Sequence, residues 1–286
     1  MSERRAFLEA IRAAPEDDTP RLVYADWLEE HGEGETDRDR AEFIRVQCEL
    51  ARLRFGSPEL EARHSALAGR AVELLVRRQD GWVAELNLPP NRLTRCWFHR
   101  GMVSNVWCTV RYFVEHGDAL LDAAPVEVVC FRRATVRNVT ELRRSPALPR
   151  LRGLEFLMEE TPAAVVARLF EAVPVGHLRT VLLKTHVVNV MAPDWHTRNA
   201  ALAVTLARCP GLAGLKRLWL WHAGVGDEGG RALARSPHLA GLGFLNLEGN
   251  ALSPEVEAEL RQRFGRRLCL GQSDYPRFTA GELGWV

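Results

Sequence analysis

Residues 212–252 contain one pattern of leucines that occurs twice. The first copy reads LAGLKRLWLWHAGV over residues 212–225, and the second reads LAGLGFLNLEGNAL over residues 239–252. Leucines occupy the same four places in both copies, which are offset by 27 residues. Two aligned copies at one period indicate that the chain contains a structural repeat.

Weaker copies of the pattern extend toward the N-terminus. The second copy carries the L-x-L-x-x-N-x-L pattern of a leucine-rich repeat, ending at Asn250 and Leu252. Apolar cores with the same spacing begin at positions 103, 126, 151 and 178, and the successive offsets are 23, 25, 27, 37 and 27 residues. All but one fit the range of about 20 to 29 residues for such repeats. The long interval contains an insertion around residues 191–199, and a degenerate last strand is expected at 268–270.

The segments between the expected strands predict the fold class. Residues 114–124, 162–173, 199–209 and 227–235 have the composition of short helices. A unit of one strand and one helix cannot bury its strand face alone, so neighbouring units must stack. We therefore expect an α/β fold, a leucine-rich-repeat solenoid over residues 91–286 with parallel strands on the concave side and helices on the convex side. Repeats near 27 residues, and the loop from Gly224 to Ala234, resemble the ribonuclease-inhibitor-like subclass.

Residues 1–90 predict a small all-α module ahead of the array. Ser2 and Thr19 are candidate N-caps, and Pro20 stands at a first helical position. Helical spacing of apolar residues continues from 43 to 51, and a fourth helix is expected from Pro58 to Arg78. We expect this module to pack against the array and cover its open end.

Three segments of the module carry a resemblance to a known family. They are FLEAI at 7–11, DDTPRLVYADWLEE at 17–30 and RAEFIRVQ at 40–47. Over residues 4–55 the chain resembles the bacterial repeat-companion domain, a short N-terminal module of planctomycetes and myxobacteria that typically precedes repeat arrays. The resemblance implies this architecture and lineage, and it implies no activity because the family has no assigned molecular role.

The module is also dense in groups that could bind a metal or transfer protons. These groups are Asp17, Asp18, Asp26, Glu30, His31, Asp37 and Asp39. Acidic residues at helix starts are also what capping and the helix dipole favour, and neither EF-hand nor H-E-x-x-H spacing is present. An enzyme or metal site in this module therefore stays open as the first alternative function.

Strand alternation identifies the residues of the concave face. If Leu218 and Leu220 point into the core, Trp219 and Trp221 point away from it. Applied to every strand, this rule gives a candidate partner-binding set of Trp107, Arg132, Glu155, Lys184, Arg217, Trp219, Trp221, Phe244, Asn246 and Glu248. Exposed aromatic rings and arginines are frequent interface anchors. An alternative reading is that Tyr275–Val286, or the insertion containing Trp195, covers these rings.

Composition and charge narrow the function classes. Lys and Arg number 38 and Asp and Glu number 37, so no global field attracts nucleic acid or a membrane. RNA binding through the arginine-rich stretches at 132–133, 143–144 and 261–267 is the second alternative, but these stretches lie beside acidic residues. No segment approaches the roughly 20 apolar residues that span a bilayer. Six cysteines without a C-x-x-C pair fit a reducing cytoplasm.

Two further motifs favour no catalytic site. Cys96 and His99 form a C-x-x-H pair without a second half nearby, and the glycines 224, 226 and 229 lack the rest of a nucleotide-binding fingerprint. The sequence thus predicts a cytoplasmic, non-enzymatic interaction scaffold that binds a partner protein through the concave face, without a cofactor or metal.

Overall fold

The structure, a computed structural model, describes residues 3–53, 57–89, 95–172, 175–185 and 197–271. Within these residues, one open sheet contains eight strands whose order follows the chain. The first two strands form an antiparallel hairpin and every later pair is parallel. The strands are β1 Arg95–His99, β2 Met102–Thr109, β3 Val128–Arg132, β4 Gly153–Leu157, β5 Thr180–Lys184, β6 Arg217–Trp221, β7 Phe244–Asn246 and β8 Leu268–Cys269.

The register of the parallel strands follows the leucine pattern. One row of Cα partners crosses seven strands through the buried residues Val106, Val129, Leu154, Val181, Leu218, Leu245 and Leu268. Neighbours in this row are 23, 25, 27, 37, 27 and 23 residues apart in the sequence. The predicted strand positions are therefore confirmed, including the last strand. The hairpin strand β1 was not predicted.

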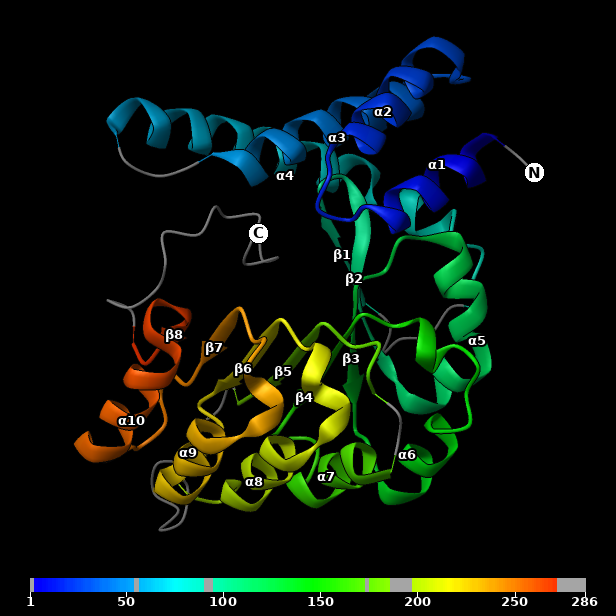
Figure 1. Ribbon diagram of the computed structural model, residues 1–286. Helices are drawn as coiled ribbons and strands as arrows, with labels where there is room; N and C mark the ends of the chain where they lie inside the picture. Colours follow the sequence, from blue (N-terminus) through cyan, green and yellow to red (C-terminus); the bar gives the residue numbers. More distant parts are fainter. Residues whose placement is uncertain (1–2, 54–56, 90–94, 173–174, 186–196, 272–286) are drawn as a thin grey trace.

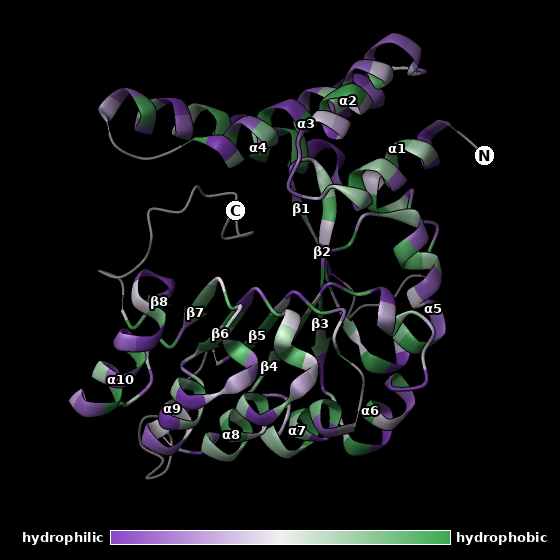
Figure 2. Cartoon of the chain, viewed as in Figure 1, coloured by the Kyte–Doolittle hydropathy of each residue, from purple (hydrophilic) through white to green (hydrophobic). Residues whose placement is uncertain are grey.

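A helix lies between each successive pair of parallel strands. These helices are α5 Val110–Ala123, α6 Val136–Leu142, α7 Ala163–Ala172, α8 Ala200–Arg208, α9 Gly226–Arg235 and α10 Pro254–Phe264. Figure 1 shows them along the outer side of an arc, with the strands along its inner side. Green and purple residues alternate along α9 and α10 in Figure 2, as expected for helices with one face on a sheet. The four predicted helical segments are confirmed as α5, α7, α8 and α9, with shifted ends.

Asn250 connects neighbouring units of the sheet. Its Nδ2 donates hydrogen bonds to the carbonyl oxygens of Leu220, at 2.6 Å, and Leu247, at 2.8 Å. Its Oδ1 accepts a hydrogen bond from the backbone N–H of Val225 at 3.1 Å. The asparagine of the sequence pattern therefore satisfies backbone groups that the loops would otherwise leave unpaired.

The residues before the sheet form an all-α module, as predicted. Its helices are α1 Glu3–Ala13, α2 Thr19–His31, α3 Glu35–Arg52 and α4 Pro58–Ala84. Asp18, not Thr19, is the N-cap residue of α2, and Ser2 lies outside the described residues. Helix α4 continues past its predicted end at Arg78 because Trp82 packs into the core with 1% of its surface exposed.

One apolar core runs from the module into the sheet. The rings of Phe43 and Trp82 have centroids 4.9 Å apart, and Phe98 of β1 lies 5.9 Å from Trp82. The same buried cluster continues through Val106 to the later strands. The module therefore packs on the β1–β2 end of the sheet, and α3 and α4 extend across the inner side of the arc in Figure 1. Among the helices described, none is long and apolar enough to cross a membrane.

Candidate binding face of the sheet

The candidate residues lie on the sheet face opposite α5–α10, in rows set by the register. The central row of Cα partners is Trp107, Cys130, Glu155, Leu182, Trp219 and Asn246. Lys184 and Trp221 are partners in the row beyond it, and Arg217 and Phe244 in the row before it. Side chains that are far apart in the sequence are therefore neighbours on one face.

Aromatic rings gather at the β6–β7 end of the face. The ring centroids of Trp219 and Phe244 are 5.2 Å apart, and the Nζ of Lys184 lies 5.9 Å from the Trp219 ring. Trp221 meets the ring of His222 edge-on at 4.6 Å. Trp219 and Trp221 are partly exposed, while Leu218 and Leu220 between them are buried on the helix side. This alternation is what a strand with one face on the core produces.

A second aromatic group lies at the β1–β2 end. The rings of Trp97 and Trp107 are 4.6 Å apart, and the Cζ of Arg132 lies 5.1 Å from the Trp107 ring. Both carboxylate oxygens of Glu160 accept hydrogen bonds from Arg132, which lowers the pKa of that carboxyl. The guanidinium of Arg132 is thus held by the carboxylate of Glu160 and by the ring of Trp107, which together restrict its motion.

A buried ion pair separates the two aromatic groups. The Nζ of Lys184 lies 3.4 Å from Oε1 of Glu155, and the side chains are 9% and 1% exposed. Burial lowers the pKa of Lys184, and the charge of Glu155 opposes that shift. Burial also raises the pKa of the neighbouring Cys130 thiol. Since the thiolate is the reactive form of cysteine, Cys130 is not an activated nucleophile.

The ten candidate residues differ in exposure. Glu155, Lys184, Phe244 and Asn246 are buried, whereas the six others, Trp107, Arg132, Arg217, Trp219, Trp221 and Glu248, are partly exposed. Arg217 forms an ion pair at 3.1 Å with Glu16, in the loop between α1 and α2, so it also links the sheet to the module. The segments that were considered as covers for the rings, around Trp195 and at Tyr275–Val286, lie outside the described residues.

Five of the six acidic candidates of the module, all except Glu30, have ion-pair or backbone contacts among the described residues. Asp26 binds Arg45 at 2.7 Å, Asp39 binds Arg78 at 2.6 Å, and Asp18 binds Arg52 at 2.6 Å. Oxygens of Asp17 and Asp37 accept backbone N–H bonds of Thr19 and Glu33. Across the part of the chain that the structure describes, no group of three His, Cys, Asp or Glu side chains is placed to hold a metal ion.

Cys96 and His99 lie on β1 with pKa values that keep both neutral near pH 7. Burial lowers the pKa of His99 to about 3, and the positive charges of Arg100, Arg21 and Arg217 add to the shift. Burial raises the pKa of Cys96 to about 11. A thiol that stays protonated and an imidazole that stays neutral do not form the thiolate–imidazolium pair of cysteine catalysis.

Sequence reasoning missed Trp97, whose ring contacts that of Trp107, because β1 was not predicted. Its alternating residues RCWFH could have signalled a strand. Comparisons with protein-family models, with curated proteins and with solved structures find no match to this chain.

Proposed function

We propose that the chain is a leucine-rich-repeat protein that binds a partner protein through the strand face of its sheet and catalyses no reaction. The observation that carries this proposal is the pair Trp219 and Trp221, two indoles on one strand that are partly exposed on the face opposite the helices. Tryptophan is among the residues most enriched where interfaces gain their binding energy. Arg217, on the same strand, adds a cation beside them.

The finer classification follows from the same pattern. The in-register rows, one helix per strand and the Asn250 hydrogen bonds support an array of the ribonuclease-inhibitor-like kind. The all-α module supports membership in the bacterial repeat-companion family, and six buried cysteines that form no disulfide fit the cytoplasm. We expect the module to fix the β1–β2 end of the array while the sheet face binds.

The charges of the face favour a protein over a nucleic acid. Arg132 is neutralised by Glu160, Lys184 by Glu155, and Arg217 by Glu16. A phosphate track needs cations that are not already paired with carboxylates. A mixed, partly aromatic surface is instead typical of protein–protein interfaces.

The test begins with capture of partners from native lysate by the wild type and by a Trp219→Ala, Trp221→Ala double variant. Each captured protein is then purified, and its affinity for both forms is measured by calorimetry. The matched control is Arg111→Ala with Arg137→Ala, whose side chains are 81% and 91% exposed on the outer helices. Circular dichroism confirms that all three forms fold.

We expect the double variant to bind at least about 30-fold more weakly, since interface hot spots contribute about 2 kcal/mol or more. The control should bind like the wild type. A purified partner that binds the double variant with unchanged affinity would contradict the proposal. Binding that weakens steeply with salt and depends on RNA would favour the nucleic-acid alternative instead.

A further inference from the structure

A cavity between the helical module and the sheet contains a buried cation, two of whose nitrogens find no hydrogen-bond partner among the described residues. The cavity has a volume of about 270 Å³ and is lined by all four helices of the module, by β2 and by the α5–β3 connection. Arg40 of α3 lines it with only 8% of its surface exposed. In the described part of the chain, neither Nε nor Nη1 of Arg40 has a hydrogen-bond partner.

Aromatic rings hold the Arg40 guanidinium in place. Its Cζ lies 4.7 Å from the ring centroid of Trp82 and 5.2 Å from that of Phe98. Stacking of this kind orients the planar group but does not satisfy its N–H donors. Burial lowers the pKa of Arg40 to about 10, so it remains charged at neutral pH. The indole Nε1 of Trp82, on the same cavity, is a further buried donor for which the described residues provide no acceptor.

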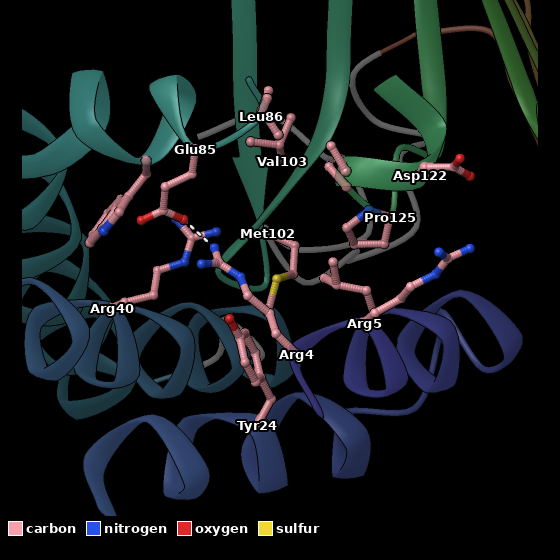
Figure 3. Close-up of a pocket in the computed structure, with 14 residues that line it drawn as sticks. Arg4, Arg5, Tyr24, Arg40, Glu85, Leu86, Met102, Val103, Asp122 and Pro125 are labelled. Atoms are coloured by element: carbon pink, nitrogen blue, oxygen red, sulfur yellow. Dashed lines mark hydrogen bonds and ion pairs between the residues drawn. The ribbon is translucent and has the colours of Figure 1, made fainter. Parts of the chain in front are cut away.

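The other charges of the cavity neutralise one another or groups outside it. Glu85 forms an ion pair with Arg4, and the side-chain ends of Arg4, Arg40 and Glu85 lie together in Figure 3. Asp122 binds Arg150 at 2.6 Å. Arg5, which points away from this group in Figure 3, binds Glu9 at 3.2 Å.

This charge count leaves one positive charge in excess, shared by Arg4 and Arg40, because the charge of Glu85 acts on both guanidinium groups. An unpaired buried charge is costly, and a bound ion of opposite sign would remove that cost. One surplus cation matches a monoanion better than a phosphate dianion. Arg4 and Arg5 have side chains that are 45% and 57% exposed, so they lie toward the opening while Arg40 and Trp82 lie deeper.

We propose that this cavity is a binding site for a small monocarboxylate, whose carboxylate accepts hydrogen bonds from Arg40 and Trp82. The apolar part of the ligand packs against the remaining lining, which includes Leu86, Met102 and Val103. The cavity volume of about 270 Å³ is below the usual range of roughly 300 to 1,000 Å³ for drug-sized pockets, so we expect a small ligand. The site is separate from the strand face, and its existence does not depend on partner binding there.

The test measures binding of acetate and benzoate to the full chain by calorimetry and by thermal unfolding at constant ionic strength. Benzamide, the neutral counterpart of benzoate, and inorganic phosphate serve as comparison ligands. We expect saturable binding of at least one carboxylate, with benzamide at least about tenfold weaker because a charge-assisted hydrogen bond is lost. The indole N–H resonance of Trp82, assigned from its loss in Trp82→Phe, should shift on binding.

The variant Arg40→Met removes the cation but retains an apolar side chain that can pack on the two rings. We expect it to lose carboxylate binding by at least about tenfold, while Arg45→Met, outside the cavity on the same helix, binds like the wild type. If Arg40→Met fails to fold, Arg40→Lys tests the same point because lysine lacks the planar guanidinium. Failure of both carboxylates to bind at millimolar concentrations, tighter binding of phosphate, or unchanged affinity in a folded Arg40 variant would each overturn the proposal.

Discussion

Lys184 on the sheet and Arg40 in the helical module are both buried cations, but the chain compensates them differently. Lys184 has the carboxylate of Glu155 at 3.4 Å on the adjacent strand. Arg40 has two aromatic rings and no hydrogen-bond partner for its Nε and Nη1 among the described residues. A buried charge by itself therefore does not identify a ligand site. What matters is whether the fold already provides its counter-ion.

The largest expected effect comes from removing that counter-ion on the sheet. Glu155→Gln should lower the free energy of unfolding by about 3–5 kcal/mol, because the buried charge of Lys184 then loses its ion pair with Glu155. Urea denaturation measures the loss. The double variant Glu155→Leu, Lys184→Met should recover most of it, since an apolar pair of similar volume removes both desolvation penalties. If Glu155→Gln is as stable as the wild type, Glu155 does not compensate the buried charge of Lys184.

The second prediction tests whether the module and the array unfold as one unit. Leu218→Ala in the sheet and Leu74→Ala in α4 each truncate a fully buried side chain of one continuous core. Each should lower the free energy of unfolding by about 3 kcal/mol. Circular dichroism and tryptophan fluorescence should report a single coincident transition in both variants. Two separate transitions, with one region unaffected by each substitution, would mean that the regions are independent domains.

The third prediction concerns pH and the half-buried His99 at the junction of the two regions. Its folded pKa of about 3 lies below its usual value of 6.5. Below pH 6.5 the unfolded chain therefore binds a proton that the folded chain excludes, and stability falls as the pH decreases toward the folded pKa. The slope is at most about 1.4 kcal/mol per pH unit, which gives up to about 2 kcal/mol between pH 6.5 and pH 5.

Urea denaturation of the wild type and of His99→Gln at both pH values isolates this contribution. The other titrating groups are common to both proteins, so only the difference between their pH slopes is compared. Equal slopes would show that folding does not lower the pKa of His99.

The smallest expected effect concerns the loops that join units of the array. Asn250→Ala should lower the free energy of unfolding by about 1–2 kcal/mol, because it leaves the carbonyl of Leu220 and the N–H of Val225 without their partner. Thermal unfolding measures this loss. Asn138→Ala, which removes a capping contact of the short helix α6, is the matched control and should have a smaller effect. The reverse order would mean that Asn250 does not connect the units.

Much of the sheet could be predicted because its leucine pattern recurs at short intervals along the sequence. Strand alternation placed Leu218 and Leu220 in the core and Trp219 and Trp221 on the other face. Helices α6 and α10 were not predicted. α6 is short, but Ser253 followed by Pro254 is a helix-start signal that could have identified α10.

The binding face was predicted only as a set of positions. The alternation of a strand does not say which of these positions are buried. In the structure, Glu155 and Lys184 form a buried ion pair, and Phe244 is buried as well. The Arg40 cavity was not predicted at all. Its one signal in the sequence is an arginine that precedes Phe43 and Ile44 at helical spacing, which is also the pattern of an ordinary surface residue.

The strand positions, their intervals and the all-α character of the first residues could be predicted from the sequence alone, because these depend on periodicities of a few residues and on turn chemistry. Which charges are neutralised depends on the packing of whole elements. Lys184 meets Glu155 because the register of β4 and β5 places them on one face, and Arg40 meets Trp82 and Phe98 because α3, α4 and β1 share a core. Contacts between residues so distant in the chain depend on how whole elements pack, and no local pattern encodes them.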